Sequence, residues 1–596
     1  MDIEKREAFV IRQVLLLLIS FLLVWIVSSF GHKDALEFTY TTSRSFEKFL
    51  LASLAIYGCG NIISVCVRKS VGDRAQFLLP TIFVGLLIFY GWKTLLHNED
   101  VYIASGVAGI LLLIVAYVCR VKNLEAVIEK MNRGDEKWYR LILFVGIGVW
   151  LAFVVGNTVA RYLSYVAPTY DMGIFTQMFY YMKKNLTAVT TCERSKILSH
   201  FQVHVSPALY IFLPIYAIFP SPVTLVVCQA FVVISGIIPM CKLMNGHGFS
   251  PMTKAFFGLA VIFYPCLAGG CFYDFHENKM LFAAILWLLY LMEKKKKLFF
   301  WGLVVFTLMI KEDAAIYVAC LGLFMMFNRK EYKKGSLVVV VSMLVFAGDV
   351  YFLNHYGDGA MTERYANYLD QGENSFVYMI INLLKNPVYV FSQMFTETKA
   401  QFLLWMLIPT LGLPFVTKRC SDYILLLPMI LMNLMGANEY QSSIYYQYTY
   451  ATAAFLFYLT VLHLEPMEKV KRVKMTCFMA LASILLFASA LSLKSKYLPQ
   501  YFENKEMYQE MDVDLARIPK DASVRATTYL VPKLAQRDVI YAYNFSEDLT
   551  DYICYDLIYG SSMEYYNNDV EKLKSIGYEE ILHSNHLVIL KRADVK

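Results

Sequence analysis

Residues 281–330 read LFAAILWLLYLMEKKKKLFFWGLVVFTLMIKEDAAIYVACLGLFMMFNRK, and this stretch decides the fold class. It consists of apolar runs separated by short charged tips, Lys294–Lys297 and Lys311–Asp313. The pattern extends in both directions, because 58% of the 596 residues are hydrophobic and only 17% are charged, whereas an average soluble domain has about 25% charged residues. A soluble fold cannot bury that much apolar surface, so the sequence predicts an α-helical polytopic membrane protein.

Basic residues in the loops assign the two sides of the membrane, since cytoplasmic loops carry an excess of Lys and Arg. This rule places the N-terminus, Lys294–Lys297 and the basic cluster at 329–334 in the cytoplasm. The assignment requires that the Pro-interrupted stretch Pro207–Phe219 does not cross the membrane and instead forms a re-entrant or interfacial helix. About 15 transmembrane helices then fit every basic cluster, with the C-terminus outside.

Three regions of the chain differ in composition. Residues 1–120 are expected to form an N-terminal block of four spans, and residues 138–495 the main transmembrane core. Residues 497–596 change to mixed charges with short apolar runs, which is typical of a small α/β domain, expected on the external side. Two long loops of the core, 161–221 and 354–400, are expected on the same side.

Polar residues interrupt the apolar sequence mainly in the segments assigned to the external side. Ionisable residues at membrane depth are costly, and they are therefore candidates for function. The motifs are Tyr170–Phe175 (YDMGIF), His200–Pro207 (HFQVHVSP), Phe272–Lys279 (FYDFHENK), Lys311–Asp313 (KED), Asn438–Gln441 (NEYQ) and Tyr445–Tyr448 (YYQY).

Each motif also has an ordinary structural interpretation. Asp171 equally suits a helix N-cap or an Asx-turn. His200 and His204 are four residues apart, which would place two metal ligands on one helix face, but no HExxH pattern accompanies them. Lys311–Asp313 suits a charged hairpin tip, and Tyr445–Tyr450 suits an interfacial aromatic belt. The convergence of several motifs on one side of the membrane favours a functional site.

The motifs resemble those of a bacterial and archaeal family of membrane proteins, domain of unknown function 2079 (DUF2079), over roughly residues 140–596. YDMGIF, HFQVHVSP, FYDFHEN and KEDAA carry the resemblance, together with IPKDASVRATTYLVPKLAQRDVIY at 518–541. This family is related to the GT-C glycosyltransferases, so the resemblance implies a GT-C-like core. It also implies a functional role for Asp171 in the first large external loop and a second external acid at Asp274. Lys533 stands where family members often have a histidine.

The resemblance implies an enzyme that transfers a sugar from a polyprenyl-phosphate donor to an acceptor at the external face. Such a transfer needs a carboxylate that takes the acceptor's proton and cations that stabilise the leaving phosphate. Asp171 is the predicted base, and Asp274 and Glu312 are the other catalytic candidates, either of which would orient the acceptor. The predicted substrate-binding residues are Arg161, Lys279 and Lys311, facing the phosphate, and His200, His204, His276, Tyr446 and Gln447.

The expected partners follow from the same interpretation. No metal ligand is assigned, and the use of a divalent metal stays open, as does the acceptor, which is a glycan, a lipid or a protein. No nucleic acid is expected, because the basic residues gather in inter-helix loops. The predicted location is the plasma membrane. The main alternative is a transporter or flippase of lipid-linked glycans, which would spread polar residues through the depth of the bilayer.

Overall fold

The computed structural model describes residues 46–71, residues 136–595 with internal gaps, and part of residues 9–27. The gaps are at 195, 360–361, 370–378, 380–386, 395, 418 and 544–547. The chain divides into two compact units, one of residues 1–128 with 488–493 and one of residues 129–487 with 494–596. In the first unit, helix α3 (Phe46–Val71) covers the second expected span. The expected spans near 76–95 and 101–119 lie outside the described residues.

Four helices among the described residues are long and apolar enough to cross a membrane, and a bent helix pair is a further candidate. This confirms the helical membrane class, but the expected number of about 15 spans is not confirmed. The four are α7 (Glu136–Leu163), α10 (Pro222–Ser235) continued by α11 (Ile237–Gly246), α17 (Tyr332–Tyr356) and α22 (Lys469–Leu491). The bent pair, with an angle of 42°, begins with α12 (Pro251–Ile262) and continues through α13 (Pro265–Gly269).

Several apolar runs that were expected as spans form helices too short to cross a bilayer unaided. The charged tips end them, because α14 stops before Lys294 and α15 stops before Lys311. The stretch that was predicted not to cross contains a 3₁₀ turn and α9 (Leu213–Ile218), and it too is one of the shorter apolar helices. The shorter helices include α8 (Ile174–Asn185), α14 (Met280–Glu293), α15 (Lys297–Leu308), α16 (Ala314–Phe327), α19 (Pro387–Met394), α20 (Glu397–Leu407), α21 (Tyr450–Leu464) and α23 (Tyr497–Glu503).

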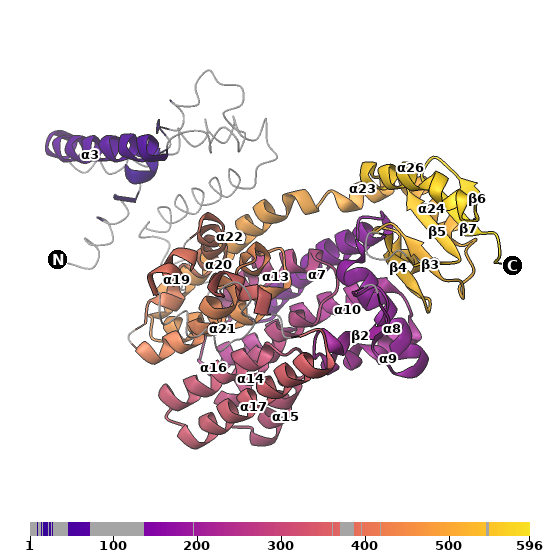
Figure 1. Ribbon diagram of the computed structural model, residues 1–596. Helices are drawn as coiled ribbons and strands as arrows, with labels where there is room; N and C mark the ends of the chain where they lie inside the picture. Colours follow the sequence, from indigo (N-terminus) through magenta and orange to yellow (C-terminus); the bar gives the residue numbers. More distant parts are fainter. Residues whose placement is uncertain are drawn as a thin grey trace. The chain divides into compact units, whose positions relative to one another are not determined.

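Helices α14 to α17 pack against one another in chain order (Figure 1). Two glycines bring α16 and α17 together. A Cβ atom on Gly335 would lie 2.6 Å from the Gly322 carbonyl oxygen, and one on Gly322 would lie 2.9 Å from the Gly335 carbonyl oxygen. Small residues at helix interfaces permit such backbone contact, and close packing of this kind holds helices together where lipid supplies no hydrophobic driving force.

The C-terminal residues form a small domain built on a five-stranded sheet, as the composition of 497–596 predicts (Figure 1). The strand order is β4-β3-β5-β7-β6; β3 pairs in parallel with β4 and β5, whereas β7 pairs antiparallel with β5 and β6. The strands are β3 (Val524–Ala526), β4 (Ile540–Ala542), β5 (Tyr552–Asp556), β6 (Tyr578–His583) and β7 (Leu587–Arg592). The helices are α24 (Lys505–Leu515), α25 (Val531–Leu534) and α26 (Gly560–Ser575).

Alternating residues of the sheet enter two hydrophobic clusters. Ile553 and Tyr555 of β5 pack with Leu573 of α26, whereas Tyr552 and Cys554 join a cluster with α24 and α25. This alternation is the period of two that a strand imposes. The second cluster also takes in buried side chains from the segment that follows α7, namely Tyr165, Ile174 and Cys192. The small domain therefore shares its core with the segment that carries Asp171.

Candidate functional site

The Asp171 carboxylate lies in an irregular turn between α7 and α8. This π-helical turn, Thr169–Gly173, breaks at Asp171, whose φ of 58° is left-handed and uncommon for a residue with a Cβ atom. The N-cap position of α8 is Gly173, so Asp171 does not cap that helix. Its Oδ2 atom is buried and has no hydrogen-bond partner. A strained backbone and an unpaired buried oxygen at one residue mark a functional candidate.

Neighbouring charges act on the Asp171 carboxyl group. Burial, and then the carboxylates of Glu277 and Asp274, raise its pKa to about 8, against the opposing effect of Lys279 and Lys311. A carboxyl group whose pKa lies near neutral pH is suited to proton transfer.

The C-terminal domain contacts the Asp171 turn directly. Thr169 donates its backbone N–H to Thr528 Oγ1 at 3.1 Å, and its hydroxyl donates to the Thr528 carbonyl oxygen at 3.2 Å. Two residues after Asp171, a Cβ atom on Gly173 would lie 2.9 Å from Val531 Cγ1. Since no larger side chain fits there without movement, the glycine allows α25 to contact the turn directly.

Asp274 forms an ion pair with Arg161, near the end of α7. The guanidinium makes two contacts with the carboxylate, of which the longer, Nη2 to Oδ2, is 3.4 Å. Lys279 donates to the carbonyl oxygen of the same residue, whose φ of 65° is again left-handed. Two-point pairing of this kind fixes the carboxylate in orientation as well as in charge. Asp274 is thus brought beside two of the predicted phosphate-binding cations.

A buried ion pair lies among these charged residues, which together with Asp171 form a polar cluster. Lys311 Nζ lies 2.8 Å from Glu277 Oε1, and neither side chain is exposed. The same ammonium lies 3.4 Å from His276 Nε2. Backbone N–H groups fix the histidine, because its Nδ1 accepts from Asn278 N at 3.3 Å while its own N–H donates to Gln229 Oε1 at 3.0 Å.

Glu312 and Asp313 make separate contacts, although they are adjacent in sequence. Glu312 accepts from His204 Nδ1 at 2.9 Å and from the Val205 N–H at 3.2 Å. Asp313 lies 3.9 Å from Arg364 and accepts from Asn278 Nδ2 at 3.4 Å. One oxygen of Asp313 and the amide oxygen of Asn278 are buried without a hydrogen-bond partner. The tip between α15 and α16 is therefore part of the cluster rather than a solvated hairpin.

Tyrosine rings line one side of the cluster. The centroids of Tyr273 and Tyr446 are 4.5 Å apart, and Tyr440 lies 5.8 Å from Tyr446 and 5.5 Å from Tyr448. The Arg364 guanidinium lies 5.3 Å from the Tyr448 ring centroid. Gln447, between two of these tyrosines, is buried, and its side-chain oxygen has no partner. Aromatic faces with polar edges of this kind can pack against a polar ligand.

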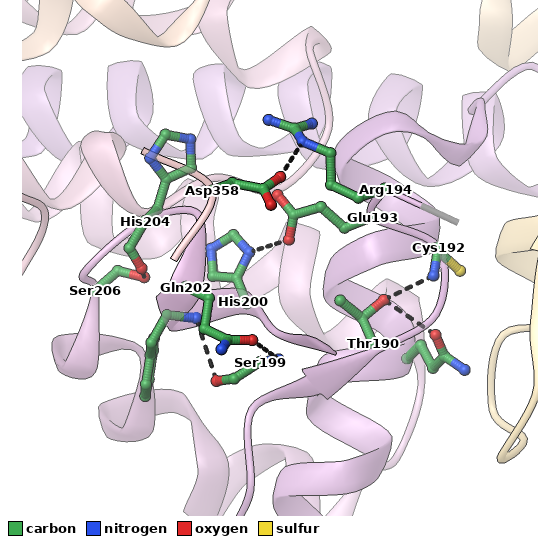
Figure 2. A network of polar contacts seen from close by, with 12 residues as sticks. Thr190, Cys192, Glu193, Arg194, Ser199, His200, Gln202, His204, Ser206 and Asp358 are labelled. Atoms are coloured by element: carbon green, nitrogen blue, oxygen red, sulfur yellow. Dashed lines mark hydrogen bonds and ion pairs between the residues drawn. The ribbon is translucent and has the colours of Figure 1, made fainter. Parts of the chain in front are cut away.

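The two histidines of the HFQVHVSP motif face different carboxylates. His200 Nδ1 lies 2.8 Å from Glu193 Oε2, a contact that Figure 2 shows, whereas His204 pairs with Glu312. The two rings are 5.8 Å apart, centroid to centroid. Within residues 136–595, apart from the gaps, no group of three or more His, Cys, Asp or Glu side chains is placed to hold a metal ion. At this spacing of four residues, His200 contacts Glu193 and His204 contacts Glu312.

Apart from Gln447, the predicted residues form one network of contacts and electrostatic interactions, although they come from distant segments. Sequence reasoning missed several members: Glu193, Glu277, Asn278, Asp313 and Arg364. Glu277, Asn278 and Asp313 lie within motifs quoted above, so the sequence shows where they stand but not which residues they contact. Glu193 and Arg364 lie outside every quoted motif, and only their contacts with His200 and Asp313 reveal them.

The sequence matches the model of a family described as predicted membrane proteins (DUF2079) over residues 161–578. The chain belongs to this family. The matched range includes every predicted site residue, from Arg161 to Gln447. No curated protein matches the sequence.

Two solved structures of one protein are similar to the chain. They are ArnT from Cupriavidus metallidurans bound to undecaprenyl phosphate, with a TM-score of 0.47, and the same protein in the apo state, with a TM-score of 0.44. Sequence identity is 10% in both. The alignments cover 77% and 76% of this chain and 98% and 97% of the ArnT chains.

Proposed function

We propose that the chain is a membrane glycosyltransferase that transfers a sugar from a polyprenyl-phosphate donor to an acceptor hydroxyl at the external face. The observation that carries the proposal is the state of Asp171. Its Oδ2 atom is buried and unpaired, and its backbone is held in the left-handed region. A buried carboxylate oxygen without a partner costs free energy in the folded protein, so its retention favours a role with a bound ligand.

Asp171 acts as the general base in this proposal. The other two catalytic candidates are engaged, because Asp274 is paired with Arg161 and Glu312 accepts from His204. These contacts suit positioning of the acceptor rather than proton removal. Burial raises the pKa of Asp171, and a raised pKa makes the ionised carboxylate a stronger base for the acceptor's hydroxyl proton.

The positive charge for the leaving phosphate comes from Arg161, Lys279 and Lys311. All three lie among the carboxylates of the cluster, and the pKa of Asp171 responds to Lys279 and Lys311. Phosphate leaves with an added negative charge, and preorganised cations in a buried site stabilise that charge strongly. Tyr446 and Gln447 offer an aromatic face and an unpaired amide oxygen to the sugar.

The family adds support of a different kind. Residues 161–578 belong to DUF2079. The relation of this family to the GT-C glycosyltransferases implies a lipid-phosphate sugar as the donor. The apolar helices beside the cluster supply surroundings for a polyprenyl tail. A flippase would also need such surroundings, but it would not need an unpaired base.

Mass spectrometry of lipids that co-purify with the protein tests the donor assignment. The expected finding is a polyprenyl-phosphate sugar. Purified protein incubated with that lipid and candidate acceptors should release polyprenyl phosphate and form a glycosylated acceptor. Movement of the intact lipid-linked sugar across a vesicle membrane, with no release of polyprenyl phosphate, would favour the flippase instead.

A further inference from the structure

We infer that His200, held by Glu193, faces the phosphate of the polyprenyl donor and gives it a proton as the sugar departs. This inference rests on the proposed function and extends it to a histidine–glutamate pair within the same site. It assigns a role to Glu193, which no sequence motif singled out.

In this pair, one nitrogen of the His200 ring contacts a carboxylate and the other has no hydrogen-bond partner. His200 Nδ1 lies 2.8 Å from Glu193 Oε2, so this nitrogen carries the proton that the carboxylate accepts. The other ring nitrogen, Nε2, is buried and has no hydrogen-bond partner. His200 is 2% exposed and Glu193 is 6% exposed, so water does not readily satisfy Nε2. An unpaired nitrogen in this position is suited to a ligand oxygen.

The segment on either side of Glu193 is fixed, which orients its carboxylate (Figure 2). On one side, the Thr191 N–H donates to Gln177 Oε1 at 2.6 Å. On the other side, Arg194 Nε donates to Asp358 Oδ2 at 2.7 Å. Residues whose neighbours are anchored in this way hold their geometry without a ligand, as a preorganised site requires.

The His200 backbone is equally constrained. It begins a 3₁₀ turn that Ser199 and Gln202 close, since the Phe201 N–H donates to the Ser199 hydroxyl and the Ser199 N–H donates to Gln202 Oε1. The Phe175 ring packs against the imidazole in a T-shaped arrangement, with the centroids 5.1 Å apart. The ring can therefore present Nε2 in only a narrow range of directions.

Charged groups around the imidazole favour its protonated form. Burial alone would lower the pKa of His200, but Glu193 and, less strongly, Glu277 raise it against the opposing charge of Lys311. Two other titratable rings interact with it: His204, whose centroid is 5.8 Å away, and His276, whose pKa the charge of His200 helps to lower. A protonated imidazole held in this way donates from Nε2, and it carries a positive charge that attracts phosphate.

The three expected phosphate ligands already have partners in the site. Arg161 is paired with Asp274, Lys311 is paired with Glu277, and Lys279 donates to a carbonyl oxygen. These groups supply positive potential, but part of their hydrogen-bonding capacity is committed. His200 adds a donor with its second nitrogen open, near the same Glu277–Lys311 pair that influences Asp171.

The reaction step balances in atoms and charge. The acceptor oxygen forms a bond to the anomeric carbon, and the bond from that carbon to the phosphate oxygen breaks with its electron pair on the oxygen. Asp171 takes the proton of the acceptor hydroxyl, and His200 Nε2 gives its proton to the phosphate oxygen. One proton is taken and one is given, and exchange with water returns both groups to their starting states.

Binding of undecaprenyl phosphate to the purified full-length protein in detergent tests this inference without requiring turnover. The variants are His200→Gln and Glu193→Gln. His247→Gln is the matched control, because His247 is likewise paired with glutamate, 3.0 Å from both Glu293 and Glu465, but in a separate network. Affinity is measured from pH 5 to pH 9, and thermal melting of each variant reports its folding.

The expected result is a loss of roughly tenfold or more in affinity for His200→Gln at low pH, as for a charge-assisted hydrogen bond. The ratio of wild-type to His200→Gln affinity cancels the titration of the ligand itself. This ratio should fall toward one as pH rises and His200 loses its charge. In Glu193→Gln the affinity should fall at lower pH than in the wild type, because the carboxylate that favours imidazolium is gone. His247→Gln should bind as the wild type does.

Three outcomes would overturn the inference: equal affinity of His200→Gln and wild type, a ratio that does not change with pH, or an equal loss in His247→Gln. A wild-type protein that binds no undecaprenyl phosphate would also overturn it. If the His200-dependent binding were present but no sugar were transferred from any polyprenyl-phosphate donor, the proposed glycosyl transfer would fail while the phosphate contact stood.

Discussion

Lys311 and Glu277 form an ion pair in which the Nζ and Oε1 atoms are 2.8 Å apart and both side chains are completely buried. Burial alone would lower the pKa of Lys311, but the carboxylates of Glu277 and Glu312 raise it, so the lysine stays charged. Each member of the pair therefore depends on the other for its charge to be tolerated. The pair links the segment before α14 with the tip before α16, and both segments carry predicted site residues.

Removal of one member should destabilise the protein more than removal of both. Lys311→Met leaves the Glu277 charge buried and uncompensated, a change that typically costs about 3–5 kcal/mol. The double variant Lys311→Met/Glu277→Gln removes the charge and should recover most of the loss. Thermal melting in detergent measures both effects. If the single variants Lys311→Met and Glu277→Gln both melted at the wild-type temperature, water or other groups would be compensating the remaining charge.

Asp171→Asn should abolish most turnover while sparing the fold. Asparagine has nearly the same size but cannot take the acceptor's proton, so the rate should fall by about 100- to 10,000-fold. The assay needs a polyprenyl-phosphate sugar and an acceptor, and donor binding is measured separately. Full activity in a well-folded variant would rule out Asp171 as the base and make Asp274 the next carboxylate to test.

The pH dependence of both rate and stability should follow Asp171. Its pKa is raised to about 8, so ionisation of the base should make the rate rise as pH approaches that value, until loss of the His200 proton opposes the increase. Between the unfolded pKa of about 3.9 and the folded value, the folded state holds a proton that the unfolded state has released, so stability falls as pH rises. Asp171→Asn lacks this loss and should melt progressively above wild type from pH 5 to pH 8. If the melting temperatures of wild type and Asp171→Asn changed equally with pH, the raised pKa of Asp171 would be contradicted.

Gly173→Ala should disturb the Asp171 turn through the C-terminal domain. The added Cβ atom would lie 2.9 Å from Val531 Cγ1, and overpacking of this kind costs about 1–3 kcal/mol. We expect lower activity and a lower melting temperature, with recovery when Val531→Ala is added. Gly148→Ala, where nothing lies within 4 Å of the new atom, is the control and should remain active. A failure of Val531→Ala to rescue would place the effect elsewhere.

Thiol labelling of intact cells tests the two sides assigned from charge. Tyr170, which is 52% exposed, is replaced by cysteine beside Asp171, and the exposed Lys295 is replaced in a second variant. An impermeant reagent added outside should label Tyr170→Cys and not Lys295→Cys. The exposed native Cys59 and Cys420 are first changed to serine. Labelling of both variants from outside would show that Pro207–Phe219 crosses the membrane.

Composition and pattern predicted the membrane class and the small C-terminal domain. The apolar runs Val539–Tyr543 and Leu587–Leu590, which stand out in a charged region, contain or overlap β4 and β7. The number of spans did not follow, because apolar runs of 12 to 14 residues such as α14 and α15 match neither a full crossing nor a soluble helix clearly.

The site was predictable in its motifs but not in its pairings. Sequence shows that His276 and Glu277 are adjacent, but it does not show that Glu277 contacts Lys311, more than thirty residues later. Likewise, Glu193 stands seven residues before His200. No periodicity joins them, because Glu193 lies in the loop of a short hairpin, between the strands Val189–Thr190 and Leu198–Ser199, and His200 directly follows the second strand.

The contact between Thr169 and Thr528 bridges 359 residues of sequence. At a synthesis rate of about 5–20 residues per second, roughly 20 to 70 seconds separate the appearance of the two threonines at the ribosome. Throughout that interval the nascent chain has its first loop but lacks the strands and helices that support it. A chain that terminates early therefore never completes the Asp171 turn, which makes finished synthesis a condition for the proposed activity.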